Sequence, residues 1–367
     1  MDRKKLYMHL GTGKTGTTAI QELLDANADF LAEEHGILYA SSGKRGINHH
    51  LLCANFQRTD PNVEQRVRHH LQELAQEIEQ TDLHTVVVSS EYFPDVTAEE
   101  IESIYLPILS EVAEIHPVLY LRRQDTFLES WYGQIAKAQT AGWAAGIHRL
   151  DERLRAAGIF DYLDHADRWA RHTGDENTHV RPFERRQLVG EDAGYDFLDV
   201  LGIEDRTGIV PIPHRSNPSL TRDQLILLQV LQAAKIDAAV LKQLSDPFPE
   251  LSDTGSRFLL SPEERQQVID DHDDVNSEVA RRFLGREDGR LFLDPGPVEA
   301  EKGWEPQDGP SSEVVVAAIR KIAAAPRSGG AAASGPDAKT VAEIDSIRRS
   351  LAQLSTRLDK LSPSRKG

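Results

Sequence analysis

Short apolar runs alternate with amphipathic stretches along the first part of the chain. The apolar runs are rich in β-branched and aromatic residues, as buried strands are, and they cover residues 4–10, 84–93, 116–123 and 178–185. The stretches between them have apolar positions at helical spacing, and they cover residues 17–30, 61–82, 97–115, 126–139 and about 162–172. Helical patterns then dominate residues 219–285. This alternation predicts an α/β fold with three layers, in which helices cover both faces of a central parallel sheet and a helical part follows.

The character of the chain changes near residue 300. Residues 301–337 are rich in proline, glycine, alanine and serine, which predicts a flexible linker after a first domain over 1–300. Residues 338–363 then carry apolar positions at nearly heptad spacing: Val341, Ile344, Ile347, Leu351, Leu354, Leu358 and Leu361. Such a segment forms either a helix that lies on its own domain or a coiled coil. We favour a coiled coil that joins chains into a homo-oligomer through 341–361, because a helix this short is marginal alone in water.

The composition narrows the classes of function. A net charge of -17 repels nucleic acid and anionic membranes, so an anionic ligand would need a local basic pocket. No stretch approaches the ~20 apolar residues that cross a bilayer, and the N-terminus resembles neither a signal peptide nor an anchor. Cys53 is the single cysteine, so a disulfide framework and a multi-cysteine metal site are both excluded. These features predict a cytoplasmic protein without a membrane span.

The glycine-rich turn after the first predicted strand, LGTGKTGTT at 10–18, resembles a nucleoside-triphosphate loop but differs from it in spacing. Such a loop needs a glycine five positions before Gly13, and Met8 occupies that position, inside the strand. A turn that leads into a helix N-terminus still presents backbone N–H groups to an anion. Lys14 adds a positive charge and Thr15, Thr17 and Thr18 add hydroxyl donors. The turn therefore predicts an anion-binding site.

A second motif lies far along the chain, in LYLRRQDTFLES at 119–130. Arg122 stands at the end of a predicted strand, and Ser130 follows eight residues later in the next predicted helix. Because the carboxyl ends of parallel strands meet at one edge of a sheet, Arg122 reaches the same edge as the glycine-rich turn. Ser130 can then close on the same anion.

Together these two motifs resemble those of the sulfotransferases that use 3′-phosphoadenosine 5′-phosphosulfate, most closely the bacterial branch. The resemblance covers roughly residues 4–300, implies a P-loop-NTPase-like fold, and rests on these two segments. It implies that the 5′-phosphosulfate is held by one continuous set of residues: Gly13, Lys14, Thr15, Gly16, Thr17 and Thr18. It also implies that Arg122 and Ser130 hold the 3′-phosphate, and that the product is adenosine 3′,5′-bisphosphate.

This chain departs from the family pattern at three points. Gly13 replaces the usual proline, and Ala19 stands where the animal cytosolic enzymes have a tryptophan that stacks on adenine. Their late Arg-Lys-Gly phosphate loop has no clear counterpart, although Arg215 is a candidate contributor. The adenine contact and a third contact to the 3′-phosphate are therefore unassigned by the sequence.

The resemblance also implies a mechanism without a metal ion. Lys14 would neutralise the charge that grows on the bridging oxygen of the leaving phosphate. Glu91, at the end of the apolar run VVVSSE, is a candidate general base because partial desolvation raises the pKa of a carboxyl group. His50, with its neighbour His49, is the rival candidate, since histidine titrates near neutrality. The family uses both residue types, so the choice stays open.

The acceptor and two rival functions also stay open. The acceptor hydroxyl or amine could belong to a small molecule or a saccharide. A nucleotide-dependent kinase of the P-loop class is one rival, but it would want Mg²⁺ ligands and a strand that ends in aspartate. A non-catalytic scaffold that acts through its C-terminal segment is the other. The converging anion contacts favour the sulfotransferase interpretation over both.

Overall fold

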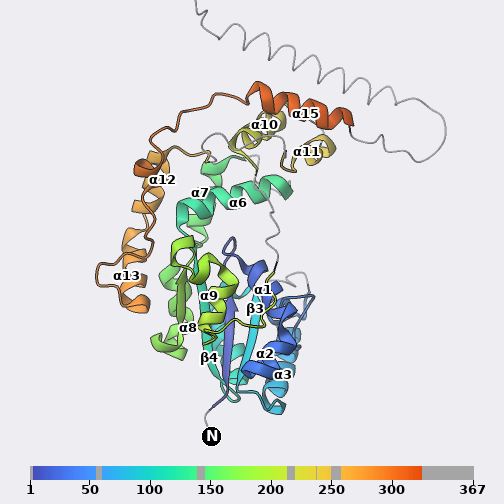
Figure 1. Cartoon of the computed structure of the whole chain (residues 1–367), viewed down its shortest axis with the longest axis vertical. Helices are drawn as coiled ribbons and strands as arrows, with labels where there is room; N and C mark the ends of the chain where they lie inside the picture. Colours follow the sequence, from blue (N-terminus) through green and yellow to red (C-terminus); the bar gives the residue numbers. More distant parts are fainter. Residues whose placement is uncertain are drawn as a thin grey trace, which may run out of the picture.

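The computed structural model describes residues 3–54, 60–138, 145–212, 220–236, 238–248 and 258–324 (Figure 1). Its centre is a five-stranded sheet in which every pair of neighbours is parallel. The strands are β1 (Lys5–Leu10), β2 (Ile37–Tyr39), β3 (Thr85–Ser90), β4 (Glu114–Leu121) and β5 (His179–Pro182). They are arranged in the order β2-β3-β1-β4-β5. The α/β fold with a parallel sheet that the sequence predicts is therefore confirmed.

The central strand β1 lies where the order of the strands reverses. The chain goes from β1 to β2 and β3 on one side, and then to β4 and β5 on the other. In the register, Leu10 pairs with Ser90 of β3 and with Leu119 of β4. The segments that follow β1, β3 and β4 therefore meet at one edge of the sheet. Such a switch point is where open parallel sheets bind their ligands.

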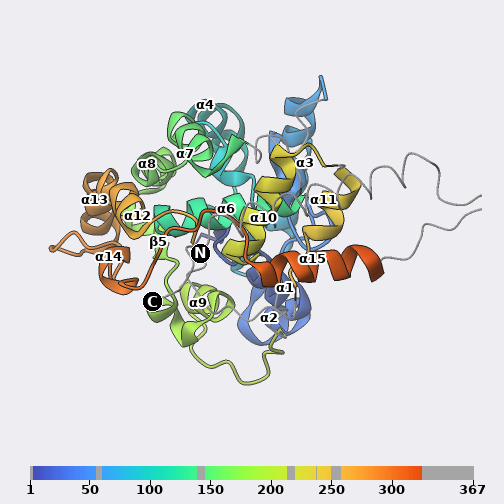
Figure 2. The same ribbon diagram turned by 90° about the horizontal axis from the view of Figure 1, so that it is seen from above.

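Helices cover both faces of this sheet, in agreement with the alternating pattern of the sequence (Figures 1 and 2). The helices of the first part are α1 (Thr17–Ala26), α2 (Ala28–His35), α3 (Val63–Gln80), α4 (Ala98–Glu100), α5 (Leu106–Leu109), α6 (Gln124–Ala138), α7 (Ile147–Ala156), α8 (Tyr162–Thr173) and α9 (Ala193–Val200). Those of the second part are α10 (Arg222–Ala233), α11 (Ala238–Leu244), α12 (Pro262–Asp270), α13 (Asp273–Leu284), α14 (Pro297–Ala300) and α15 (Ser312–Ala324).

Alternation of side chains along the strands creates two apolar layers. Leu6, Met8 and Leu10 of β1 pack in one layer with apolar residues of α3, α8 and α13. Tyr7, one position out of phase, packs in the other layer with residues of α1, α2 and α9. Burial of apolar residues on both faces explains why the strands read as continuous apolar runs.

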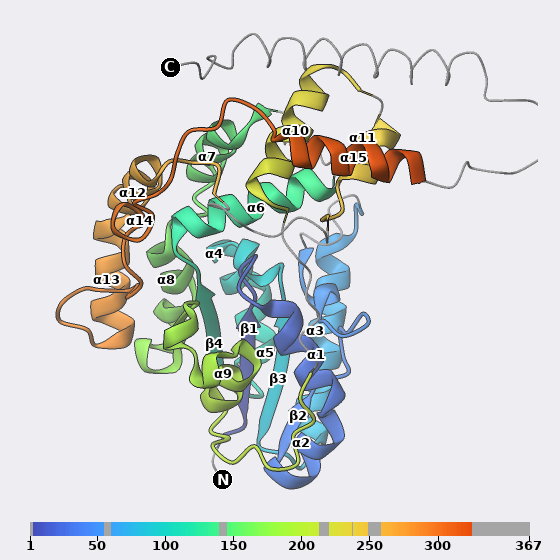
Figure 3. The same cartoon turned by 45° about the horizontal axis from the view of Figure 1, so that its top comes forward.

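A third apolar cluster forms a helical cap over the carboxyl edge of the sheet. It joins α6, α7, α10, α11, α12 and α15, and its buried residues include Leu128, Leu228 and Leu241. Figure 3 shows α6 crossing above the strands, with α10, α11 and α15 beyond it. The glycine-rich turn and the start of α6 therefore lie between the sheet and this cap.

The structure differs from the sequence prediction in several elements. One helix was expected over 17–30, but the chain breaks at Asn27, whose side chain donates to the backbone of Leu23 and Val210. The helix expected over 97–115 ends at Leu109 and contains a π-helical stretch, Ile101–Tyr105. Short strand β2 and helices α7 and α9 were not predicted from the sequence.

The linker predicted over 301–337 needs a correction. Residues Ser312–Ala324 form α15, which packs on α10 and α11 through Val314, Ala317 and Ala318. This helix was not expected from the composition, because residues rich in proline and glycine lie on both sides of it. Residues 325–337 and the coiled-coil segment 338–363 lie outside the described residues. None of the described helices is long and apolar enough to cross a bilayer.

Candidate functional site

The turn after β1 is shaped by two residues with left-handed backbone. Gly16 has φ of 76° and directly precedes α1, and Lys14 has φ of 67°. Alternation of such conformations turns successive N–H groups toward one concave side, which favours an anion. A non-glycine residue at positive φ carries strain of about 1–3 kcal/mol, and such strain is concentrated at functional sites. The loop therefore has the backbone geometry of an anion-binding site at the N-terminus of α1.

Position 13 must be glycine because the ring of Trp131 of α6 lies beside it. A Cβ atom on Gly13 would lie 2.5 Å from Cζ3 of the Trp131 ring. The Trp131 ring also stacks on Phe127, with ring centroids 5.6 Å apart and an interplanar angle of 10°. The aromatic pair thus occupies the space beside the loop. This contact leaves no room for a side chain at position 13.

The three threonines of the loop differ in placement. Thr15 is fully buried, and its hydroxyl donates to the backbone carbonyl of Thr12 rather than to the solvent side. Thr17 is also buried, and among the described residues its hydroxyl has no hydrogen-bond partner. Thr18 is exposed and lines a cavity together with Thr17. Thr18 is therefore open to a ligand, whereas the hydroxyls of Thr15 and Thr17 lie inside the protein.

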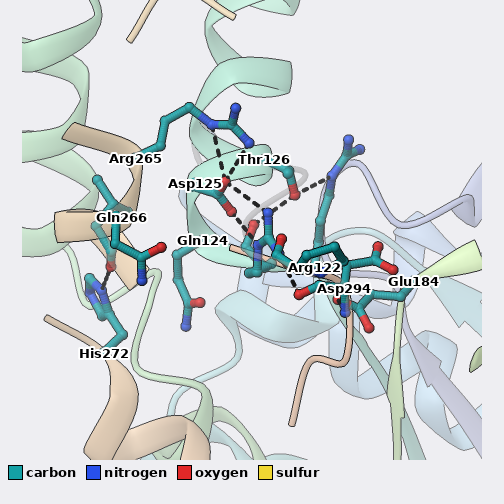
Figure 4. A network of polar contacts seen from close by, with 12 residues as sticks. Arg122, Gln124, Asp125, Thr126, Glu184, Arg265, Gln266, His272 and Asp294 are labelled. Atoms are coloured by element: carbon teal, nitrogen blue, oxygen red, sulfur yellow. Dashed lines mark hydrogen bonds and ion pairs between the residues drawn. The ribbon is translucent and has the colours of Figure 1, made fainter. Parts of the chain in front are cut away.

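Arg122 reaches the loop from the end of β4, as the sequence predicts. Its Nη1 atom donates to the backbone carbonyl of Lys14 at 2.9 Å, and its Nε atom donates to Thr126 at 3.2 Å (Figure 4). The guanidinium group also lies over the Phe183 ring, 5.9 Å from its centroid. Ser130 lines the same cavity as Arg122.

Arg123, next to Arg122, has a structural role instead. Its guanidinium group is buried and pairs with Asp125. Asp125 is fully buried and also pairs with Arg265 of α12 at 2.7 Å (Figure 4). Arg123 donates further to the backbone carbonyls of Asp294 and Pro295. The network joins the start of α6 to the segments around α12 and α14, and thereby holds the cap against the sheet edge.

Two adjoining cavities open at this edge, and they share Lys14 and Gln134. The first, here called the Arg122 cavity, has a volume of about 770 Å³. Its charged and hydroxyl-bearing lining includes Lys14, Arg122, Arg123, Thr126, Glu129, Ser130, Lys137, Glu184, Arg185 and Asp294. The second, here called the Glu91 cavity, has a volume of about 640 Å³. It is lined by the loop, by Glu91, Tyr92, Pro94 and Asp95, and by Phe127, Trp131, Leu154, Ile159 and His165.

Lys14 stands at the junction of the two cavities. Its Nζ atom donates to Oε1 of Gln134 at 2.6 Å. Burial, Arg122 and Lys137 lower the pKa of Lys14, whereas Glu91 raises it. A half-buried ammonium group beside other cations favours an added anion, because the anion relieves their mutual repulsion.

Glu91 follows β3 and lines the cavity that bears its name. Its carboxyl group is exposed to the cavity, yet the surrounding protein raises the pKa of Glu91, and Lys14 opposes this shift. A carboxylate with a raised pKa, beside a lysine and in an open cavity, is suited to accept a proton. The structure therefore brings Glu91 and Lys14 together.

The two histidine candidates do not line either cavity in the described part of the chain. His49 is fully buried, donates through Nε2 to Ala40 at 2.8 Å and accepts from Ser89 N–H at 3.1 Å. Both its nitrogens are thus occupied in the neutral form, and burial lowers the pKa of His49 to about 4. His50 contacts the Ser90 hydroxyl at 2.9 Å, and burial followed by Arg45 lowers the pKa of His50 to about 4. Arg215 lies outside the described residues.

The cavities contain several residues that the sequence did not single out for these roles. Lys137 stands one turn after Gln134 on α6, and Phe183 presents a half-buried ring from the end of β5. Glu129 is buried in the same cavity, accepts from Leu260 N–H at 2.8 Å, and burial raises its pKa to about 7. His165 of α8 lines the Glu91 cavity. Positions 130, 134 and 137 share one helix face, a spacing that would have indicated Lys137.

Comparison with known proteins adds little to this description. No family model matches the chain, and no solved structure matches it. A protein of Archaeoglobus fulgidus, itself uncharacterized, is similar to this chain, with 25% identity over 240 residues. The alignment covers 64% of this chain and 63% of the relative, so the chain spans less than two thirds of that protein's length.

Proposed function

We propose that this protein transfers the sulfuryl group of 3′-phosphoadenosine 5′-phosphosulfate to a hydroxyl or amine group of an acceptor. One observation carries the proposal: Arg122 binds the backbone of Lys14, and the two cations meet where a basic cavity adjoins one that holds Glu91. A donor with anionic groups at both ends of a nucleoside matches this arrangement. The resemblance of the two sequence motifs to the sulfotransferases is independent support.

The donor would lie across the junction of the cavities. Its 3′-phosphate would contact Arg122 and Ser130 in the Arg122 cavity. Its 5′-phosphosulfate would lie over the loop N–H groups, with the sulfonate directed into the Glu91 cavity. The adenine would stack on the ring of Phe183, beside Arg122. This ring would supply the aromatic contact that Ala19 cannot make.

The reaction would then proceed in line. The acceptor oxygen forms a bond to sulfur while the bond between sulfur and the bridging oxygen breaks, and that electron pair stays on the 5′-phosphate. Lys14 stabilises the charge that develops there, and the loop N–H groups are already oriented toward it. The acceptor proton passes to the Glu91 carboxylate, the candidate base that lies in the same cavity as Lys14.

Calorimetric titration with two nucleotides tests the proposal. Adenosine 3′,5′-bisphosphate should bind without added metal, and Arg122→Met should weaken it about 10- to 100-fold, since a charge-assisted hydrogen bond contributes about 1.5–3 kcal/mol. Arg149→Met is the matched control, because Arg149 is exposed on α7 and lines neither cavity. Tight Mg²⁺-dependent binding of ATP, with no binding of the bisphosphate, would instead indicate a kinase. Incubation with ³⁵S-labelled donor and fractionated cell extract then tests transfer itself.

A further inference from the structure

The two cavities differ in charge. The described lining of the Arg122 cavity carries Lys14, Arg122, Arg123, Lys137 and Arg185 against Glu129, Glu184 and Asp294. In the described lining of the Glu91 cavity, Lys14 is the cation, and Glu91 and Asp95 add two carboxylates. The sulfonate of a bound donor would also pair with Lys14 and neutralise its charge. The space that remains in the Glu91 cavity therefore disfavours an anionic acceptor.

One wall of the Glu91 cavity is a flat aromatic surface. Phe127 and Trp131 stack nearly parallel on α6, and the Trp131 ring lies against Gly13 of the loop. Leu154 and Ile159 continue this wall as apolar side chains. Flat aromatic faces bind other flat apolar faces, such as an aromatic ring or the C–H face of a pyranose. The wall stands close to Glu91 and Lys14, where the transfer would occur.

The wall also ends in a polar group. His165 is 7% exposed and lines the cavity, and its Nδ1 atom has no hydrogen-bond partner among the described residues. Burial and Arg168 lower the pKa of His165, so the ring is neutral near pH 7. The Nδ1 atom itself has almost no accessible surface, so His165 adds an uncharged ring to the wall rather than a hydrogen bond to a ligand.

From this geometry we infer that the Glu91 cavity binds an uncharged hydroxyl compound with a flat ring, which stacks on Trp131. This inference rests on the proposed function, because that function makes the Glu91 cavity the acceptor site. Aromatic and sugar rings share the required chemistry, namely a flat apolar face that bears hydroxyl groups. Ring compounds with a carboxylate are excluded by Glu91 and Asp95.

Saturation-transfer NMR tests the inference with phenyl β-D-glucoside, which carries both kinds of ring, and with phenyl β-D-glucuronide, its carboxylate counterpart. Both are measured with and without saturating adenosine 3′,5′-bisphosphate. We expect saturation of the glucoside and little of the glucuronide, and the protons that saturate identify which ring stacks. Trp131→Ala should weaken glucoside binding about tenfold, whereas Trp131→Phe should largely retain it. Trp304→Ala is the control, because Trp304 contacts Arg222 and lines neither cavity.

The outcomes separate the two proposals. Equal saturation of glucoside and glucuronide, no saturation of either, or binding unaffected by Trp131→Ala would each overturn the inference about the ring. Asp95→Asn should improve glucuronide binding. An unchanged glucuronide affinity would show that the carboxylate of Asp95 does not exclude anionic ligands. Absence of bisphosphate binding to the unmodified protein would overturn the proposed function, whereas ring binding is measured independently of the donor.

Discussion

The Nζ atom of Lys14 lies 2.6 Å from Oε1 of Gln134, and both residues line both cavities. Gln134 is a neutral acceptor on α6, one turn beyond Ser130. In this arrangement the ammonium group is held at the junction of the cavities by a residue that carries no charge. Any anion that binds Lys14 must therefore compete with an amide oxygen.

Gln134→Leu removes that competition. We expect it to tighten the binding of adenosine 3′,5′-bisphosphate about fivefold, because a hydrogen bond of about 1 kcal/mol no longer has to be broken. Gln134→Glu should weaken binding, since a carboxylate both pairs with Lys14 and repels phosphate. Calorimetric titration measures both effects. Weaker binding by Gln134→Leu would show instead that the amide contacts the donor directly.

The rate of transfer should depend on pH through Glu91. A base acts only when deprotonated, and burial raises the pKa of Glu91, so the rate should rise with pH through a value above 4.5 and then level off. Glu91→Gln should lower kcat by about 10²- to 10⁴-fold and remove this rise. Bisphosphate binding should persist in the variant. If Glu91→Gln retains kcat and His50→Asn or His165→Asn abolishes it, the base is a histidine.

Glu129 predicts a pH dependence of stability. Burial raises its pKa to about 7 from 4.5, so the folded state holds the proton more tightly than the unfolded chain does. The resulting stabilisation is fully present below pH 4.5 and is lost as pH rises to about 7, by up to about 3 kcal/mol. Glu129→Gln should flatten this fall, as measured by urea unfolding from pH 4.5 to 8. An identical pH dependence in the two proteins would contradict the prediction.

The sheet, and the proximity of Arg122 to the glycine-rich turn, were predictable because their signals are local. Lys14 and Gly16 stand in one turn, and Arg122 ends a strand whose apolar run is visible in the sequence. Parallel strands bring such ends to one edge, so distance along the chain did not obscure their proximity. Glu91 follows β3, so its position at the same edge of the sheet was predictable in the same way.

The cap and the lining of the cavities were not predictable in this way. Asp125 pairs with Arg265, 140 residues away, and a single sequence contains no signal for that contact. Arg122 and Arg123 are adjacent and chemically alike, yet one lies beside the loop and the other is held in the buried network. His165 reads as part of an amphipathic helix, and its place in the Glu91 cavity depends on how α8 packs.

The buried network should contribute strongly to stability. Asp125→Ala would leave the buried guanidinium groups of Arg123 and Arg265 without their shared carboxylate, although each keeps other contacts. We expect a loss of about 3–5 kcal/mol in the free energy of unfolding, as for other broken buried ion pairs. Glu152→Ala is the control, since it breaks an exposed pair with Arg149 and should cost less than about 1 kcal/mol. Equal losses in the two variants would show that the network is solvated.

The position of Lys137 predicts which end of the proposed donor its ammonium group contacts. Its charge lowers the pKa of Lys14, and burial lowers the pKa of Lys137 itself, so the two ammonium groups lie near each other in the Arg122 cavity. Since Lys14 is expected at the 5′ end of the donor, Lys137 should contribute there. Lys137→Met should therefore weaken adenosine 5′-monophosphate about fivefold, equivalent to about 1 kcal/mol for a half-exposed charge, and leave adenosine 3′-monophosphate nearly unchanged.

Lys242→Met is the matched control for this prediction. Lys242 is exposed on α11 and donates to the backbone carbonyl of Lys137 at 3.5 Å, so its loss removes the same charge from the same region without altering the cavity lining. Fluorescence or calorimetric titration of both monophosphates against both variants gives four affinities to compare. A larger effect of Lys137→Met on the 3′-monophosphate would place Lys137 beside Arg122 and Ser130 instead, as the missing third contact to the 3′-phosphate.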